Sequence, residues 1–267
     1  MVMAVGLVMG LHALYEIFVG GTEISLDIIM TYLPVSLLYI ASMAMGYLGL
    51  RYIELSVSSP ICNSSGALVA VMTLFMVGFS EYSPLALGAV ALVCIGAIGL
   101  GVVDYFEDEE LRAERQKASN YKYSKSLIAL ALPVAYCILD AIGTFADNRV
   151  LETLNEDSAN VAYELTFLFV GIICFIYVVV IKKDKLIPKM EAPKYVGAIC
   201  ETAGQFAYIY AIADTEHLAM SAPIISAYCA ASVLWSRIFL KEKLSRKHYL
   251  MILLVVIGIA IMGFLDM

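Results

Sequence analysis

Long apolar runs separated by short polar segments extend from one end of the chain to the other. A membrane-spanning α-helix needs about 20 mostly apolar residues, and runs of that length recur here with no gap large enough for a separate soluble domain. We therefore expect an all-α integral membrane protein. Reading each run between its polar flanks predicts nine spans, at roughly 1–19, 29–50, 57–79, 84–104, 126–146, 161–181, 194–213, 217–237 and 248–265.

The composition supports this prediction, because 61% of the 267 residues are hydrophobic and 15% are charged. Soluble domains contain roughly half apolar and a quarter charged residues, so the apolar surplus must face lipid. Nothing in the charge distribution indicates nucleic acid binding. Because Met1 to Val19 has no basic flank, we do not expect a signal peptide.

The residue types that bind metals or form disulfides are scattered along the chain. The six Cys lie singly in apolar runs without a CxxC pair, as small buried hydrophobes do. The three His (His12, His217 and His248) are far apart and form no ligand pair. We predict no metal, no cofactor and no enzymatic activity, and the chain has no nucleotide-binding loop through which ATP could drive it.

The basic residues gather in alternate loops. All of the 17 Lys and Arg except Arg149 follow the second, fourth, sixth or eighth predicted span. Cytoplasmic loops retain positive charge, so we place these loops in the cytoplasm and Met267 outside, in a multi-pass protein of the cell (inner) membrane. The intervening loops are acidic and include Glu23, Asp27, Glu81, Asp147, Glu152, Glu156, Asp157, Asp214 and Glu216.

The longest interruption divides the chain. Residues 105–125 mix acidic and basic side chains and predict a charged cytoplasmic linker. It separates a first half at 1–104, with four spans, from a second half at 126–267, with five.

The two halves resemble one another weakly in sequence. Tyr47 to Pro60 aligns with Tyr210 to Pro223 at an offset of 163 residues, which sets Ser-Ser-Pro opposite Ser-Ala-Pro. In each half a Gly-rich final span follows. Matched loops carry opposite charge, so we expect inverted-topology repeats, the plan of many secondary transporters.

The same offset places residue 1 opposite Glu164, near the start of the second helix of the second half. The first half therefore lacks a counterpart of the span at 126–146. We favour a first helix encoded upstream of Met1 over a trimmed chain or a nine-helix protein.

We expect two inverted halves, and each has a Pro near the start of its fourth helix, a following acid and a Gly-rich fifth helix. This arrangement resembles the drug/metabolite transporter superfamily, specifically its ten-helix EamA-type exporters. The resemblance implies an inner-membrane carrier that alternates access around a central cavity and exports amino acids or other small metabolites. It rests on three segments of the second half: Ala222-Pro223-Ile224, Phe239 to Ser245 and Val256 to Gly263. The first half matches more weakly, at Ser59-Pro60, Glu81 and Gly96 to Gly101.

Acids inside spans are costly in lipid and are candidates for function. Asp140 and Glu201 lie deepest in their predicted helices. Each could alternately bind a proton or another coupling ion and a substrate amine, or could simply lock two helices together through a hydrogen bond. Neighbours at helical spacing extend a polar face on either side, namely Tyr136 and Thr144 around Asp140, and Gln205 and Tyr208 after Glu201.

Pro60 and Pro223 each remove a backbone donor near an early helical turn, and we predict a helix break or hinge at each. Asn63 and Tyr228 lie close enough in sequence to meet the freed backbone groups or a ligand. Glu16 and Glu164 lie nearer the ends of their spans, where water can solvate them.

The leading hypothesis is a secondary transporter of small metabolites, in a lipid bilayer, as a monomer or homodimer. Alternatives are a lipid-linked sugar flippase or a multidrug-type efflux subunit, and a membrane-embedded enzyme has less support. Phosphorylated substrates are disfavoured because the spans hold no conspicuous set of Lys or Arg.

Overall fold

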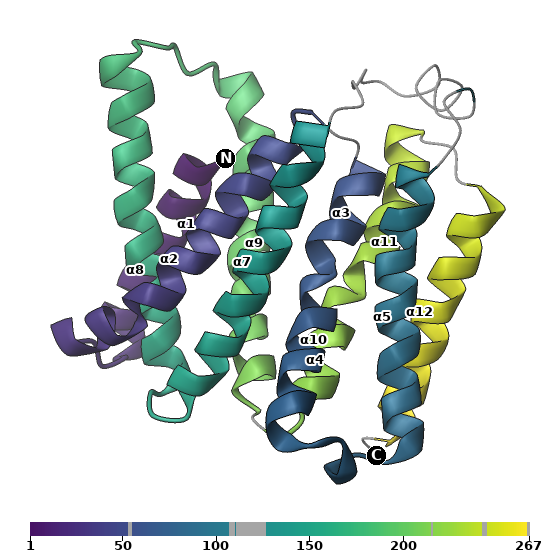
Figure 1. Ribbon diagram of the computed structural model, residues 1–267. Coiled ribbons are helices and arrows are strands. Elements are labelled where there is room, and N and C mark those ends of the chain that lie inside the picture. The colour runs from purple at the N-terminus through teal and green to yellow at the C-terminus, as the bar shows by residue number, and fades with distance from the viewer. Residues whose placement is uncertain (53–54, 107–109, 111–126, 215, 242–244, 266–267) are drawn as a thin grey trace. The chain divides into compact units, whose positions relative to one another are not determined.

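The computed structural model describes residues 1–52, 55–106, 110, 127–214, 216–241 and 245–265 (Figure 1). Within those ranges the chain forms helices and no strand, so the predicted all-α membrane fold is confirmed. The predicted linker at 105–125 lies almost entirely outside the described residues.

Each of the nine predicted spans coincides with a helix, continuous or interrupted, within the described residues. Three helices end in a π-turn, and the element after α4 is a short 3-10 turn. The elements are α1 (Val2–Tyr15) with η1 (Glu16–Gly20), α2 (Leu26–Gly49), α3 (Leu55–Asn63), α4 (Ser65–Val77), η2 (Phe79–Glu81), α5 (Pro84–Tyr105), α7 (Leu127–Leu151), α8 (Glu156–Phe175) with η3 (Ile176–Ile181), α9 (Pro188–Ala213), α10 (Leu218–Ser226), α11 (Tyr228–Trp235) with η4 (Ser236–Leu240), and α12 (Arg246–Leu265).

Six of these segments are long and apolar enough to cross a membrane, judged by length and composition over the described residues. The predicted spans at α7, α9 and α12 coincide with helices but fall outside this group. The six are Val2–Gly20, Leu26–Gly49, Ser58–Val77, Pro84–Val103, Glu156–Ile181 and Leu218–Phe239.

Several helices extend beyond their predicted ends, and the extensions of α7 and α8 matter for function. Helix α7 continues to Leu151 rather than ending at 146, so Asp147 belongs to a helix and not to a loop. Helix α8 begins at Glu156 because the side chain of Asn155 accepts hydrogen bonds from the backbone nitrogens of the next turn. Hydropathy locates the apolar centre of a helix, whereas its ends depend on such capping contacts.

The described chain divides into two compact units. Unit 1 comprises Met1–Ile40 and Ala146–Thr215, and unit 2 comprises Ala41–Phe145 and Glu216–Met267. Each unit draws helices from both predicted halves of the sequence. The boundaries of those halves remain a prediction.

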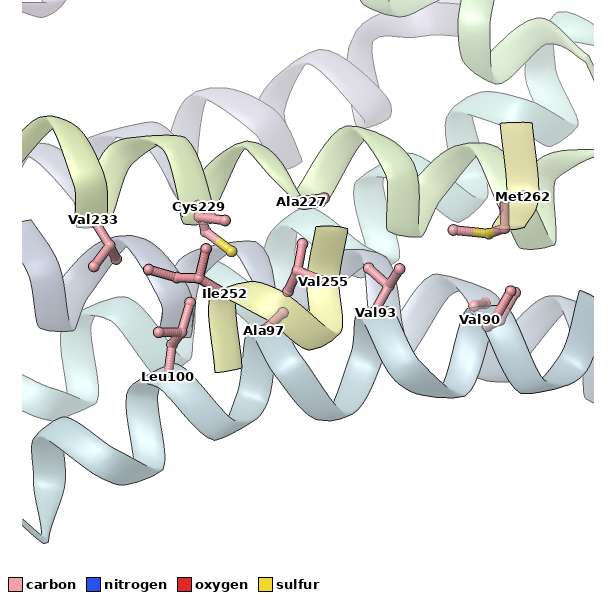
Figure 2. Close-up of a cluster of buried hydrophobic side chains, with 13 residues drawn as sticks. Val90, Val93, Ala97, Leu100, Ala227, Cys229, Val233, Ile252, Val255 and Met262 are labelled. Atoms are coloured by element: carbon pink, nitrogen blue, oxygen red, sulfur yellow. The ribbon is translucent and has the colours of Figure 1, made fainter. Parts of the chain in front are cut away.

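In unit 2, helices α5 and α12 pack closely through paired glycines. Gly96 of α5 meets Val255 of α12, and Gly258 of α12 meets Val93 of α5, so the two helices run antiparallel. Gly258 lies 162 residues after Gly96, and Val255 lies 162 residues after Val93. This spacing is close to the offset of 163 in the sequence alignment, so each glycine contacts the counterpart of a residue one turn away on its own helix. Figure 2 shows the buried apolar cluster around this contact, to which α11 also contributes.

In unit 1, α1 and α8 form a second antiparallel pair of the same kind. A Cβ atom on Gly6 would lie 2.6 Å from the backbone oxygen of Phe167, and one on Gly171 would lie 3.6 Å from that of Val2. Gly171 lies 165 residues after Gly6, and Phe167 lies 165 residues after Val2. The contact therefore matches α1 to α8, in agreement with the sequence alignment.

The two predicted proline breaks have nearly identical backbone geometry. Pro60 lies inside α3 and Pro223 inside α10, and each helix is interrupted four residues later. The interrupting residues are Ser64, with φ −64° and ψ −8°, and Ala227, with φ −66° and ψ −10°. In each, the backbone nitrogen bonds to the carbonyls three and four residues before it, which tightens that turn. Whether these breaks act as hinges remains a prediction.

All six Cys are free. Cys62, Cys137 and Cys229 are buried as expected, Cys94 and Cys174 are partly buried, and Cys200 on α9 is exposed, contrary to the expectation.

The glycine contact predicts a position-specific loss of stability. A Cβ atom on Gly96 would lie 2.8 Å from the backbone oxygen of Met251, so Gly96→Ala must push the α5 and α12 backbones apart. We expect a loss of about 1–3 kcal/mol, seen as a lower unfolding temperature in detergent. Gly88→Ala on the same helix is the control, because no described atom lies within 4 Å of the added methyl group. Equal effects at both positions would contradict the packing.

Candidate functional site

The carboxylate of Asp147 lies at the centre of a tyrosine cluster in unit 1. Its side chain is fully buried. Tyr32 donates to one carboxylate oxygen at 2.7 Å, and Tyr39 donates to the other at 3.0 Å. Among the described residues no cation pairs with Asp147, so two neutral hydroxyl groups stabilise this buried acid.

The hydrogen bonds continue from Asp147 to a residue that the sequence singled out. The hydroxyl oxygens of Tyr39 and Tyr208 are 3.1 Å apart. A tyrosine has one hydroxyl hydrogen, and Tyr39 gives its own to Asp147, so Tyr208 donates to Tyr39. A directed chain thus runs from α9 through α2 to α7.

Helical spacing explains why these side chains converge. Tyr32, Ser36 and Tyr39 recur at i, i+4 and i+7 and so share one face of α2. The end of α7 is anchored to the end of α9, because Asn148 donates to the backbone oxygen of Ile212 at 2.7 Å. That oxygen is one of the carbonyls that a helix end leaves unpaired.

Two buried polar atoms on the helices of this hydrogen-bond chain have no hydrogen-bond partner among the described residues. They are the hydroxyl oxygen of Ser36 and the side-chain nitrogen of Gln205. Ser36 lies one turn from Tyr39 on α2, and Gln205 lies one turn from Tyr208 on α9. Buried polar groups are almost always paired in native structures, so these two groups have unused capacity to bind a polar ligand or water.

Two further aromatic rings contact Tyr39. The ring of Tyr39 meets Tyr163 edge-on with centroids 6.0 Å apart, and it meets Tyr208 edge-on at 6.1 Å. Aromatic faces attract cations, and a cation near Asp147 would gain from both the carboxylate and the rings.

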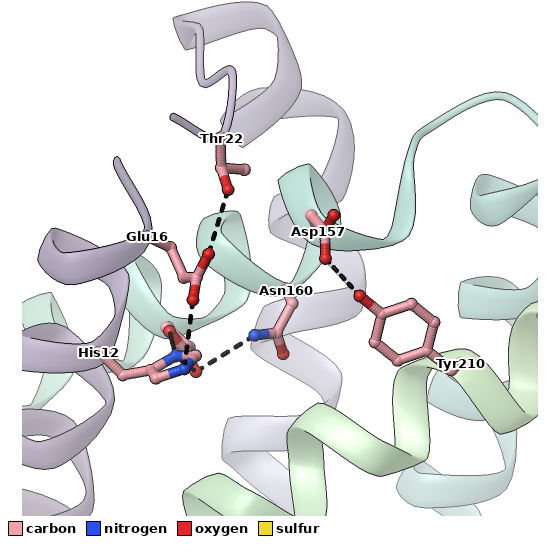
Figure 3. Close-up of polar contacts among 7 residues, drawn as sticks. His12, Glu16, Thr22, Asp157, Asn160 and Tyr210 are labelled. Carbon is pink, nitrogen blue, oxygen red and sulfur yellow. Dashed lines mark hydrogen bonds and ion pairs between the residues drawn. The ribbon is translucent and has the colours of Figure 1, made fainter. Parts of the chain in front are cut away.

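A second buried acid lies elsewhere in unit 1. Glu164 of α8 is fully buried, and Nδ1 of His12 lies 2.9 Å from each of its carboxylate oxygens. Asn160 donates to the same carboxylate at 3.2 Å (Figure 3). The expectation that water solvates Glu164 is therefore wrong. Because α8 begins before its predicted start, Glu164 lies two turns inside the helix, where α1 covers it.

The predicted residues of unit 2 each make contacts of their own. Asp140 accepts a hydrogen bond from the hydroxyl of Ser65 at 2.7 Å, directly after the break in the third span. Asn63 donates to the backbone oxygen of Ser59 on its own helix. The ring of Tyr136 fills the space beside Gly46. Tyr228 is 54% exposed.

Glu201 and Gln205 belong to unit 1 with Tyr208. Glu201 is partly exposed on α9, whereas the side-chain nitrogen of Gln205 is buried. The structure thus joins Tyr208 to a buried acid that the sequence reasoning assigned to a loop. The spacing of Asp140, Thr144 and Asp147 at i, i+4 and i+7 was the available signal.

No group of three or more His, Cys, Asp or Glu side chains within the described ranges is arranged to hold a metal ion.

The tyrosine cluster predicts a measurable contribution to stability. In Tyr39→Phe, one oxygen of Asp147 and the hydroxyl of Tyr208 lose a buried partner, so we expect a loss of about 1–3 kcal/mol. Unfolding of purified protein in detergent measures it. Tyr15→Phe is the matched control, since Tyr15 is 56% exposed. An unchanged unfolding temperature in Tyr39→Phe would mean that the hydrogen-bond chain is absent.

Comparison with known proteins identifies one family. The model of the EamA-like transporter family matches residues 126–264. Those residues lie within the segment that we predict as the second half. A comparison with curated proteins gave no match.

Proposed function

Because this chain belongs to the EamA-like transporter family, a family of membrane transporters of small molecules, we propose that it is a secondary transporter that exports small amine-bearing metabolites such as amino acids. Members of the family are transporters rather than enzymes. The chain is a multi-pass membrane protein, and its partners include a small-molecule substrate and the lipid bilayer.

The observation that carries the proposal is the fully buried carboxyl group of Asp147, which pairs with no cation among the described residues. A buried carboxylate without a cation is costly in a membrane, and such acids mark substrate or ion pathways. An ammonium group bound at Asp147 would supply a positive charge beside its tyrosine partners. Amines therefore fit this position better than neutral or anionic compounds.

The unpartnered groups beside the tyrosine chain favour a substrate with a second polar end. The amide nitrogen of Gln205 can donate to a carboxylate or carbonyl oxygen, and the hydroxyl of Ser36 can donate or accept. An amino acid or a related compound carries an amine and a carboxyl group a few bonds apart. Because the cluster offers an acceptor for the amine and donors for the carboxyl group, we propose amino acids in particular among the amines.

Access to Asp147 requires movement, because the side chain is fully buried. We propose that the inverted halves expose it to each side of the membrane in turn, with the basic loops in the cytoplasm of the cell (inner) membrane. The breaks after Pro60 and Pro223 are positions at which two helices could bend.

The test is transport by purified protein in liposomes, using a panel of radiolabelled amino acids and, for comparison, putrescine. We expect Asp147→Asn to slow transport of a moved compound by at least about thirtyfold, because it removes one partner of a buried charge pair. Asp27→Asn is the control, since Asp27 is exposed in the same unit and belongs to the acidic set that we place outside.

Unchanged transport in Asp147→Asn would contradict the assignment of the substrate amine. Loss in Asp140→Asn or Glu201→Gln, with Asp147→Asn unaffected, would return the site to the residues that the sequence favoured. Movement of a lipid-linked sugar or a hydrophobic cationic drug, with no amino acid moved, would favour the flippase or efflux alternative.

A further inference from the structure

His12 of α1 lies between two acidic side chains. Its Nδ1 is 2.9 Å from the carboxylate of Glu164, and its Nε2 is 3.7 Å from that of Glu16 (Figure 3). The exposed fraction of the side chains falls from 30% at His12 to 0% at Glu164. The imidazole ring thus connects a partly exposed position to a fully buried acid through its two nitrogens.

We propose that His12 and Glu164 form the proton-binding site of this transporter, separate from the amine-binding carboxylate of Asp147. The proposal rests on the proposed function and adds a coupling ion and its residues. Histidine changes charge near neutral pH and transfers protons through either ring nitrogen, so this pair suits a proton better than a metal ion.

A second observation indicates that the pair is a binding position. Asn160 is fully buried, and its amide nitrogen donates to Glu164, which fixes the orientation of the amide group. The amide oxygen of Asn160 then has no donor among the described residues. A protonated carboxyl group or a water molecule beside Glu164 would provide that donor.

The surrounding elements supply few other charges. Helix α1 and η1 contribute His12 and Glu16, and Thr22 donates to Glu16 at 3.4 Å. Helix α8 contributes Glu164 and, two turns earlier, Asp157, which accepts a hydrogen bond from Tyr210 of α9.

Helix α9 also contributes the ring of Phe206, which meets His12 edge-on at 5.6 Å. Glu201 lies five residues before Phe206, and the pair of Glu191 and Lys194 lies earlier still on the same helix. None of these contacts places a fixed cation beside Glu164, so His12 is the basic side chain that contacts it within the described chain.

The two buried acids differ in the group that compensates them. Within the described ranges Asp147 accepts hydrogen bonds from two tyrosines and pairs with no cation, so a ligand would have to supply the positive charge. Glu164 already has an imidazole that can become charged. One acid therefore suits the substrate amine and the other suits the proton.

The proton step balances within this pair. The neutral ring carries its hydrogen on Nδ1 and donates it to the ionised Glu164. A proton from the side that we place outside adds to Nε2 and gives the imidazolium. The Nδ1 proton then moves to Glu164, which leaves a neutral ring with its hydrogen on Nε2 and a neutral carboxyl group.

Infrared difference spectroscopy tests the site without any substrate. Full-length protein in liposomes is cycled between about pH 8 and about pH 5, a range that spans the ordinary pKa of histidine. We expect C=O bands of protonated carboxyl groups to appear in the native protein, with one component that is lost in Glu164→Gln and persists in Asp147→Asn. Glu23→Gln, an exposed Glu in the same unit, is the control. Identical spectra for the native protein and Glu164→Gln would overturn the proposal.

Transport assays distinguish proton coupling from substrate binding. For any amino acid that the native protein moves, Glu164→Gln and His12→Gln should lower accumulation driven by a pH gradient by at least about tenfold, while substrate exchange at equal pH continues. Asp147→Asn should lose both. Full pH-driven transport in either Gln variant, or loss of exchange in a folded Glu164→Gln protein, would overturn the proposal.

Failure of the proposed function and failure of the proton-site proposal give different results. If the native protein moves none of the amino acids tested, the proposed function fails, while the infrared result still decides whether Glu164 binds the proton. If Glu164→Gln does not fold, the same spectra recorded on His12→Gln decide the question. In that variant we expect the carboxyl band to shift, because its imidazole partner is gone, and an unshifted band would overturn the pairing.

Discussion

A carboxyl group inside a membrane protein must find its stabilising partners within the protein, because lipid offers none. The interior of unit 1 is organised by this constraint. Tyrosines from α2 reach across to Asp147 at the end of α7, and histidine from α1 reaches Glu164 on α8. These partners come from distant parts of the sequence, so the two acids tie the helices of the unit together.

The same constraint explains how the repeated helices pack. Apolar side chains gain little from meeting each other rather than lipid, so close association depends on small residues that let backbones approach. Gly6 and Gly171 do this for α1 and α8, and Gly96 and Gly258 do it for α5 and α12. In both pairs, each glycine contacts a residue whose counterpart in the repeat lies about one turn away on the glycine's own helix. Antiparallel packing of equivalent helices produces such reciprocal contacts, as expected for an inverted repeat.

The sequence predicted those features that depend on local patterns. Apolar length located a helix at each of the nine predicted spans, six of which are long and apolar enough to cross a membrane. The alignment of Pro60 with Pro223 anticipated two equivalent interruptions. Asp147 was missed because hydropathy ends a span where polar residues begin, whereas Asn148 holds the last turn of α7 as helix by bonding to α9. The partnership of His12 with Glu164 joins residues 152 positions apart, and no spacing within one helix could indicate it.

The location of the second acid suggests how a proton could move helices. His12 and Glu164 lie at the contact between α1 and α8, on the same pair of helices that Gly6 and Gly171 bring together. Two helices packed this tightly tolerate little change in spacing. Transfer of the proton to Glu164 replaces an ionised acceptor with a hydrogen-bond donor, and the amide oxygen of Asn160 is available to accept from it. The rearranged hydrogen bonds would therefore act directly on the contact between counterpart helices of the two halves, whose relative movement is what alternating access requires.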